Sequence, residues 1–458
     1  MRRVTRAIST FAAATAVLLA AGCGTSADPD QAADGDGQVR LYGSDGNMSS
    51  SLGDALKDQP GVLTGMKGTT PLTPLTEDFK KRIRTVDPSL ADFNYAGESY
   101  DAVVTAALAA EMARSTDAPV IAKYVVGVTV DGTECNSFKD CAALVRQGEN
   151  IQYRGVSSLK RSGLTDAGEP STATYGALNF GRDNHIDDNK TEFVGAGDES
   201  TAGKNQPAPP AGSGNTGSGN NGTKPKAAPL KVGALLPRTG ALTTQGPPMF
   251  AGARLAVNEI NEAGGVLGQP VEWAEADDGT GPQTAAVGAD RLIAAGVQVI
   301  IGPASSSATE AVVPKAVAAG RIVFSPSATS DGLSRLDDKG MFFRTSPPDV
   351  LQAKALADIV MRDGAAKVMI IARSDDYGSG LAKAVQADLT SAGVKAGNVR
   401  IVSYKDKDKY DNGDQATVFK PLAVSVKQFK PDAVVILGFD ETALLIRALH
   451  SEQIAFKS

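Results

Sequence analysis

Residues 297–330 restrict the fold more than any other stretch of the chain. Val297 to Ile301 is a short, mostly β-branched apolar run, which is typical of a strand buried on both faces of a parallel sheet. An apolar-periodic helix is expected over residues 308–319, and a second strand over residues 321–324. A strand, a helix and a strand in this order make one βαβ unit, so the stretch predicts an α/β fold with a parallel sheet.

Hydroxyl side chains occupy both loops that follow these two strands. Ser306 lies in the loop before the helix, and Ser327 and Thr329 follow the second strand. In open α/β sheets ligands bind at the carboxyl ends of the strands, and free N–H groups at the start of a helix attract an anion. A carboxylate is therefore expected here, although serine-rich loops before helices more often serve only as helix caps.

Strand and helix patterns alternate from Lys231 to His450, as expected for two successive sets of βαβ units. Residues 39–190 are different, because they hold too few strands to close a sheet and look like half of a fold. The elements expected there are strands at 39–42 and 61–66 and helices at 77–85, 100–114 and 138–147.

A linker is expected between the two halves. Residues 191–229 are rich in Gly, Ser, Asn and Pro and contain the run PAPPAGSGNTGSGNNGTKPKAAP. A flexible chain of that length has a root-mean-square reach of roughly 35 Å. We expect no order in it.

The N-terminal segment has the features of an export signal. Arg2, Arg3 and Arg6 precede an apolar stretch over residues 7–21 that is too short to span a bilayer comfortably. Leu19 to Cys23 resembles the lipobox of bacterial lipoproteins, with Ala20 as a departure because leucine is commoner there. This resemblance implies a signal peptide over residues 1–22, a lipidated Cys23, and a polar tether over residues 23–38.

With Cys23 set aside, Cys135 and Cys141 remain as an even pair in an oxidising compartment, and a disulfide is expected between them. A metal site is the weaker interpretation, because no histidine lies nearby and the spacing is not CxxC.

Composition and motifs argue against several functional classes. The net charge is −6 and no basic stripe is visible, so nucleic acid is not an expected partner. Ser157 to Lys160 matches SxxK without the accompanying KTG or SDN motifs, and residues 197–204 miss the P-loop spacing by one residue. Only His185 and His450 are present. We expect no enzymatic activity, no cofactor and no metal.

A series of motifs runs from Lys231 to the C-terminal end of the sequence. They are KVGALLPRTG at 231–240, GARLAVNEINEAGG at 252–265, Asp277-Asp278, Ile301-Gly302-Pro303, SPSAT at 325–329 and Tyr377-Gly378. Together they resemble the type I periplasmic binding proteins, and most of all the leucine/isoleucine/valine receptors of ABC transporters. The resemblance implies two Rossmann-like lobes with parallel sheets, joined by a hinge.

The order of the motifs departs from that family. There, a strand with a G-x-[DE]-G turn would follow His450, but such a segment stands instead at residues 39–46, as VRLYGSDG. The resemblance implies that residues 39–190 are the C-terminal half of the binding fold and residues 230–458 its N-terminal half. We expect a circular permutation in which strand 39–43 lies beside the strand that ends at Leu437. The alternative is two halves that never meet.

The resemblance also implies a binding site. Ser306, Ser327 and Thr329 match the positions that hold an α-carboxylate, Asp45 the one that pairs with an α-ammonium, and Tyr377 a tyrosine from the second lobe. A zwitterion buried in a cleft needs both charges met.

Two positions in this set depart from the family. Phe439 stands where a tyrosine is usual, and Gln245 where an aromatic side chain is common. The amino-acid head-group interpretation survives both changes, whereas the preference for branched-chain ligands is less secure.

These features imply a solute-binding protein, lipid-anchored on the extracytoplasmic face of the membrane. It is expected to capture a small amino acid, branched-chain or an analogue, and to deliver it to an ABC permease. The sequence leaves open a ligand-sensing lipoprotein that signals to a membrane receptor.

Overall fold

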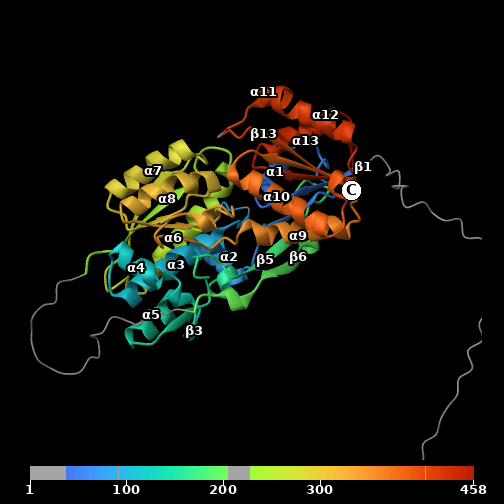
Figure 1. Ribbon diagram of the computed structural model, residues 1–458. Coiled ribbons are helices and arrows are strands. Elements are labelled where there is room, and N and C mark those ends of the chain that lie inside the picture. Colours follow the sequence, from blue (N-terminus) through green and yellow to red (C-terminus); the bar gives the residue numbers. More distant parts are fainter. Residues whose placement is uncertain (1–37, 91, 205–226, 408, 458) are drawn as a thin grey trace, which may run out of the picture. The chain divides into compact units, whose positions relative to one another are not determined.

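The first of two large sheets contains five of the described strands, all parallel, in the order β11-β10-β9-β7-β8 (Figure 1). Their bounds are β7 Lys231–Leu236, β8 Glu272–Asp277, β9 Val299–Ile301, β10 Ile322–Ser325 and β11 Phe342–Arg344. The computed structural model describes residues 38–90, 92–204, 227–407 and 409–457. The expected signal peptide, the lipidation site Cys23, nearly all of the tether and the middle of the linker lie outside these ranges.

Helices cover both faces of this first sheet, as the β-branched strand β9 predicts. Val299 and Ile301 pack into a core that includes α6 (Gly246–Glu262) and α3 (Ala96–Ala113). Ile300 points the other way, toward α7 (Pro282–Ala294) and α8 (Ser306–Ala318). The period-two alternation of a strand therefore buries every residue of β9.

The second sheet contains eight of the described strands, and both halves of the chain contribute to it. The path runs β13-β12-β14-β1-β2-β5-β6, with the short β15 beside β1. The bounds are β1 Gln38–Gly43, β2 Lys67–Pro71, β5 Thr172–Asn179, β6 Glu192–Gly197, β12 Val368–Arg373, β13 Val399–Tyr404, β14 Ala433–Leu437 and β15 Ala455–Phe456. The pairs β2–β5 and β5–β6 are antiparallel, and the other described pairs of this sheet are parallel.

Strand β1 pairs in parallel with β14, from Arg40 opposite Ala433 to Gly43 opposite Ile436. Helices α9 (Asp349–Arg362) and α10 (Asp376–Ser391) pack on one face of this sheet, and α12 (Lys420–Phe429) and α13 (Thr442–Ser451) on the other (Figure 1). Two residues of β1 with opposite orientation, Leu41 and Tyr42, are each at most 2% exposed. Strand β1 is thus a central strand, buried on both faces.

Elements of residues 77–153 complete the lobe around the first sheet. These are α2 Glu77–Ile83, α4 Ala118–Val125, β3 Thr133–Cys135, α5 Phe138–Arg146 and β4 Ile151–Tyr153; the short helices α1 Ser50–Ala55 and α11 Asn412–Asp414 belong to the second lobe. Helix α3 approaches α6 so closely that a Cβ atom on Gly252 would lie 2.1 Å from the carbonyl oxygen of Ala96. Each lobe is therefore built from both halves of the chain.

Three connections between the sheets lie within the described residues, at 72–76, 161–171 and 345–348. The expected α/β fold with two parallel-sheet lobes is confirmed. No helix of the described ranges is long and apolar enough to cross a bilayer.

Two local expectations are wrong. Residues 61–66 are turns rather than a strand, because Gly61 and Gly65 adopt φ of +78° and +80°, and the strand β2 begins only at Lys67. The linker expected over residues 191–229 is ordered at its start, since Glu192 to Gly197 form the edge strand β6. The ladder with β5 orders this stretch despite its glycines, because backbone pairing does not require large side chains.

The expected disulfide is confirmed. Cys135, at the end of β3, is bonded to Cys141 in the first turns of α5, with their Cα atoms 5.4 Å apart.

Candidate functional site

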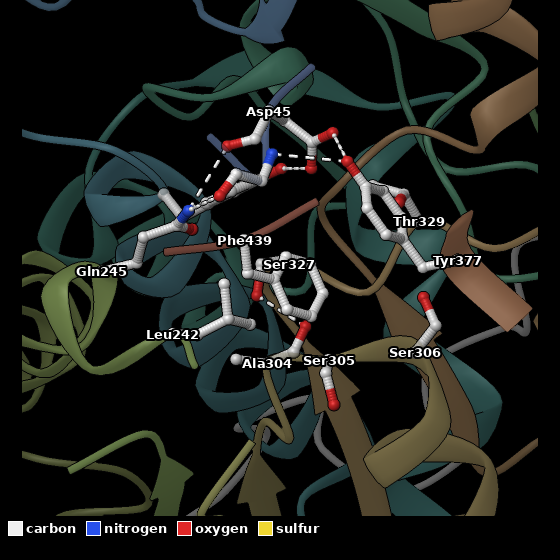
Figure 2. Close-up of a pocket in the computed structure, with 12 residues that line it drawn as sticks. Asp45, Leu242, Gln245, Ala304, Ser305, Ser306, Ser327, Thr329, Tyr377 and Phe439 are labelled. Carbon is white, nitrogen blue, oxygen red and sulfur yellow. Dashed lines mark hydrogen bonds between the residues drawn. The ribbon is translucent and has the colours of Figure 1, made fainter. Parts of the chain in front are cut away.

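The carboxyl ends of strands from both sheets face a common cavity with a volume of about 20 Å³ (Figure 2). Twelve residues line it: Asp45, Gly46, Tyr95, Leu242, Gln245, Ala304, Ser305, Ser306, Ser327, Thr329, Tyr377 and Phe439. We call residues 304–306 and 327–330 the serine rim, because they follow β9 and β10 of the first sheet. We call Asp45, Gly46, Tyr377 and Phe439 the carboxylate rim, because they follow strands of the second sheet or begin the helix after one.

Local hydrogen bonds hold the serine rim in place. The buried Asp278 accepts the backbone N–H groups of Ala304 and Thr280, both at 2.8 Å, and burial raises the pKa of this carboxyl to about 7. Ser305 caps α8 by accepting the N–H of Ala308, and its hydroxyl donates to the carbonyl of Thr280, so it points away from the cavity (Figure 2). The Ser305 hydroxyl is thus a structural cap.

The neighbouring hydroxyls have different roles. Ser306 Oγ accepts the backbone N–H of Ser330 at 3.1 Å, which leaves its own O–H as a donor to offer. Ser327 Oγ donates to the carbonyl of Ala304 at 3.0 Å, which leaves its oxygen lone pairs as acceptors. With Thr329, also buried, these side chains give the serine rim neutral polar groups and no charge.

Asp45 provides the charge of the carboxylate rim. Its oxygens accept hydrogen bonds from Tyr95 Oη at 2.6 Å, Tyr377 Oη at 2.8 Å and Gln352 Nε2 at 2.9 Å. Burial raises the pKa of the Asp45 carboxyl, and the three donors oppose that rise. Asp45 is only 5% exposed, so its charge acts in a low-dielectric environment.

Stacked aromatic rings form the wall next to Asp45. Tyr377, in the first turn of α10, stacks on Phe439 with centroids 5.3 Å apart and planes inclined by 23°. The guanidinium of Arg373 lies 4.2 Å from the centroid of the Phe439 ring. Arg373 is held by Asp375 and Glu441, each at 2.8 Å. Phe439 therefore contributes a ring to the site where a tyrosine would add a hydroxyl.

Gln245 uses its amide to join the two lobes. Its Nε2 donates to the backbone carbonyls of Asp45 at 3.3 Å and Gly46 at 3.1 Å (Figure 2). Beside it, Thr244 Oγ1 donates to Asp440 Oδ1 at 2.8 Å, again between lobes. These contacts close one side of the cavity.

All seven residues that the sequence nominates as ligand-binding line this cavity: Ser306, Ser327, Thr329, Tyr377, Phe439, Asp45 and Gln245. Sequence reasoning missed Tyr95, which donates to Asp45 from the left-handed N-cap position of α3, with φ of 57°. Its neighbours Asn94 and Ala96 complete no motif. The start of a helix was therefore the only feature of the sequence that could have pointed to Tyr95. It also missed Gly46, Leu242, Ala304 and Ser305.

The enzyme-like motifs have structural roles or none. The hydroxyl of Ser157 donates to the buried Asp101 at 2.5 Å, which also accepts Tyr153 Oη at 2.7 Å, whereas Lys160 is exposed. Within the described ranges, no group of three or more His, Cys, Asp or Glu side chains is arranged to hold a metal ion.

Comparison with known proteins relates the chain to amino-acid receptors. A sequence model of the family described as periplasmic binding protein matches residues 229–457. The chain is 30% identical over 227 residues to the Leu/Ile/Val-binding protein BraC3 of Rhizobium johnstonii, covering 49% of this chain and 58% of that protein. It is 28% identical over 180 residues to the leucine-, isoleucine-, valine-, threonine-, and alanine-binding protein of Pseudomonas aeruginosa, covering 39% and 48%.

A solved structure gives a similar partial match. The branched-chain amino acid transporter substrate binding protein of Streptococcus pneumoniae, in complex with isoleucine, is 30% identical, with a TM-score of 0.40, and the match covers 49% of this chain and 62% of that one. The chain spans about half the length of the curated relatives named above. Because the family model matches half of its residues, the chain belongs to the periplasmic binding protein family, with the α/β fold of type I.

Proposed function

We propose that this protein captures a small α-amino acid in the cavity between its lobes and delivers it to an ABC transporter. One observation carries the proposal: a buried carboxylate, Asp45, shares an enclosed cavity with the hydroxyls of Ser306, Ser327 and Thr329. A zwitterion buried there would have its ammonium met by Asp45 and its carboxylate by the O–H of Ser306, the donor of the serine rim that remains to be used.

The lining suits a small aliphatic ligand. The cavity, at about 20 Å³, has room for little more than a water molecule, so a ligand would enter only after the lobes move apart. Leu242 and the ring of Phe439 are the large apolar groups in the lining, and they suit an aliphatic side chain. The names of the relatives, which bind leucine, isoleucine or valine, support the same class of ligand.

Capture would follow hinge closure. Gln245 and Thr244 belong to the first lobe and bond to Asp45, Gly46 and Asp440 of the second lobe. Bending at the three connections between the sheets would move the lobes apart, break these contacts and admit a ligand. Closure of the lobes would then exclude water from the bound ligand.

Calorimetry with a panel of amino acids tests the ligand class, after mass spectrometry of small molecules released from the purified protein. Micromolar or tighter binding of an aliphatic amino acid is the expected result. Binding of none of them, by protein that is folded by circular dichroism, would refute the proposal.

We also propose that the two halves stand in permuted order relative to the family. The family match begins at residue 229, and residues 38–204 supply strands β1, β2, β5 and β6 of a sheet begun by β12 to β14. A chain rebuilt as residues 230–458 followed by 38–204, which keeps the strand β6, should fold to a monomer with unchanged ligand affinity. A rebuilt chain that is soluble but binds nothing would argue against the permutation.

Anchoring by Cys23 and sorting to the extracytoplasmic face complete the proposal. The full chain should partition with membranes, whereas a Cys23→Ala form should be released. If the Cys23→Ala form stayed bound to membranes, the proposed lipid anchor would be refuted. Copurification of a permease with the wild-type protein would favour transport over signalling to a receptor.

A further inference from the structure

A second carboxyl group is buried beside Thr329, a residue of the cavity lining. Asp349, the first residue of α9, is 0% exposed, and neither of its oxygens has a hydrogen bond of normal geometry with any described residue. Thr329, which lines the cavity, is next to this carboxyl group, and the backbone N–H of Asp349 donates to the Thr329 carbonyl at 2.9 Å. The Thr329 hydroxyl is the donor group beside this carboxyl and opposes the rise of its pKa. A buried carboxyl group with no well-formed hydrogen bond is rare and calls for an explanation.

The groups around Asp349 share this lack of partners. Gln352, one helical turn later, donates Nε2 to Asp45 Oδ1 at 2.9 Å, while its Oε1 has no partner among the described residues. The hydroxyl of Tyr175, in β5, is also buried without one. Helix α9 therefore carries both Gln352, which bonds to Asp45, and Asp349, which lies beside Thr329 of the cavity lining.

Among the described residues, the one cation that acts on Asp349 is Arg344, which is engaged elsewhere. The charged or titratable groups that face it are Asp45, Asp331, Arg344, Tyr175 and Tyr377. Arg344 is engaged with Glu169, at 3.1 Å and 2.5 Å, and with the carbonyls of Ala328 and Ser330. Burial and then the nearby Asp45 raise the pKa of Asp349 well above its usual range. Burial therefore disfavours the ionised form of this carboxyl in the empty site.

We infer that Asp349 is a specificity-determining residue of this site, which ionises when a ligand ammonium group enters beside Asp45. The inference rests on the proposed amino-acid ligand. Entry of the cation stabilises a second negative charge, so the proton of Asp349 leaves to solvent as the ligand binds. A ligand with a hydroxyl in place of the ammonium brings no such charge, and the site discriminates against it.

Isothermal titration in two buffers of different ionisation enthalpy counts the protons exchanged. At pH 6–7 the wild type should release up to about one proton more per ligand than Asp349→Asn does, since an amide cannot ionise. The wild-type affinity should rise by up to about tenfold per pH unit relative to this variant. Cleft closure changes the protonation of other groups equally in both proteins, so the difference in proton count between them reports on Asp349.

Asp331→Asn is the matched control, because Asp331 is a half-exposed acid beside the same site. It should keep the wild-type proton count. The preference for an amino acid over its 2-hydroxy analogue should narrow several-fold in Asp349→Asn and not in the control. If Asp349→Asn does not fold, Asp349→Ser, which also suits a helix start, replaces it.

The outcomes separate this inference from the proposed function. Equal proton counts and equal selectivity in wild type and Asp349→Asn, with the amino acid still bound, would overturn the role of Asp349 alone. A wild type that binds no amino acid would overturn the proposed function and this inference with it.

Discussion

The serine rim and the carboxylate rim face the same cavity but are assembled differently. The hydrogen bonds that hold Ala304, Ser305 and Ser306 in the serine rim lie within residues 278–330, inside two consecutive βαβ units. The carboxylate rim joins Asp45 to Tyr377, 332 positions later in the chain, at 2.8 Å. One rim is local and neutral, and the other is long-range and charged. The charged rim should therefore dominate affinity and depend on the pairing of the two halves.

The largest effect is expected from the charge itself. Asp45→Ala should weaken amino-acid binding by about 3–5 kcal/mol, because it leaves a buried ammonium without its counter-charge. Calorimetry measures the loss. Asp58→Ala, which removes a surface carboxylate paired with Arg447, should bind as the wild type does. Unchanged affinity in Asp45→Ala would show that the carboxylate rim does not hold the ligand.

Weakening the strand that carries Asp45 tests the long-range assembly. Leu41 is 2% exposed in β1 and packs in one core with Val434 and Ile436 of β14. Leu41→Ala should lower the free energy of unfolding by about 2–5 kcal/mol, through lost burial and the cavity left behind. Denaturant unfolding followed by circular dichroism measures it. Val350→Ala, at a 41% exposed position, is the control and should change stability by less than about 0.5 kcal/mol. Similar midpoints for the two variants would contradict a shared core.

The disulfide should affect stability without touching either rim. Replacing Cys135 and Cys141 by serine should destabilise the protein by about 2–3 kcal/mol on the chain-entropy model. Neither cysteine lines the cavity, so ligand affinity should stay within about twofold of the wild type. A large loss of affinity would mean that the β3–α5 loop acts on the cleft.

The smallest effect is expected in the serine rim. Ser327→Ala should cost about 0.5–1.5 kcal/mol of binding free energy, the usual contribution of a neutral hydrogen bond. Ser305→Ala is the matched variant, because that hydroxyl caps α8 and points away from the cavity. It should lower stability by about 0.5–2 kcal/mol and leave affinity unchanged. If Ser305→Ala instead lowered affinity and Ser327→Ala lowered only stability, the two serines would have the opposite roles.

Sequence reasoning was most successful where interactions are local or where motifs are dense. The alternation of apolar strands and amphipathic helices specified the α/β fold, because each unit buries its own residues at a period of 2 or 3.6. The motifs from Lys231 onward identified the family. All seven nominated residues line one cavity, because the carboxyl ends of parallel strands meet at a common edge.

Tertiary structure decided the features that depend on distant partners. Strand β6 lies in a glycine-containing stretch that only the ladder with β5 orders, and residues 61–66 turn because two glycines adopt positive φ. Tyr95 reaches Asp45 from a helix start that carries no motif, and Gln245 bonds to the backbone of the opposite lobe. Local propensity does not encode such contacts, since their energy comes from burial and hydrogen bonding between segments that meet only after folding.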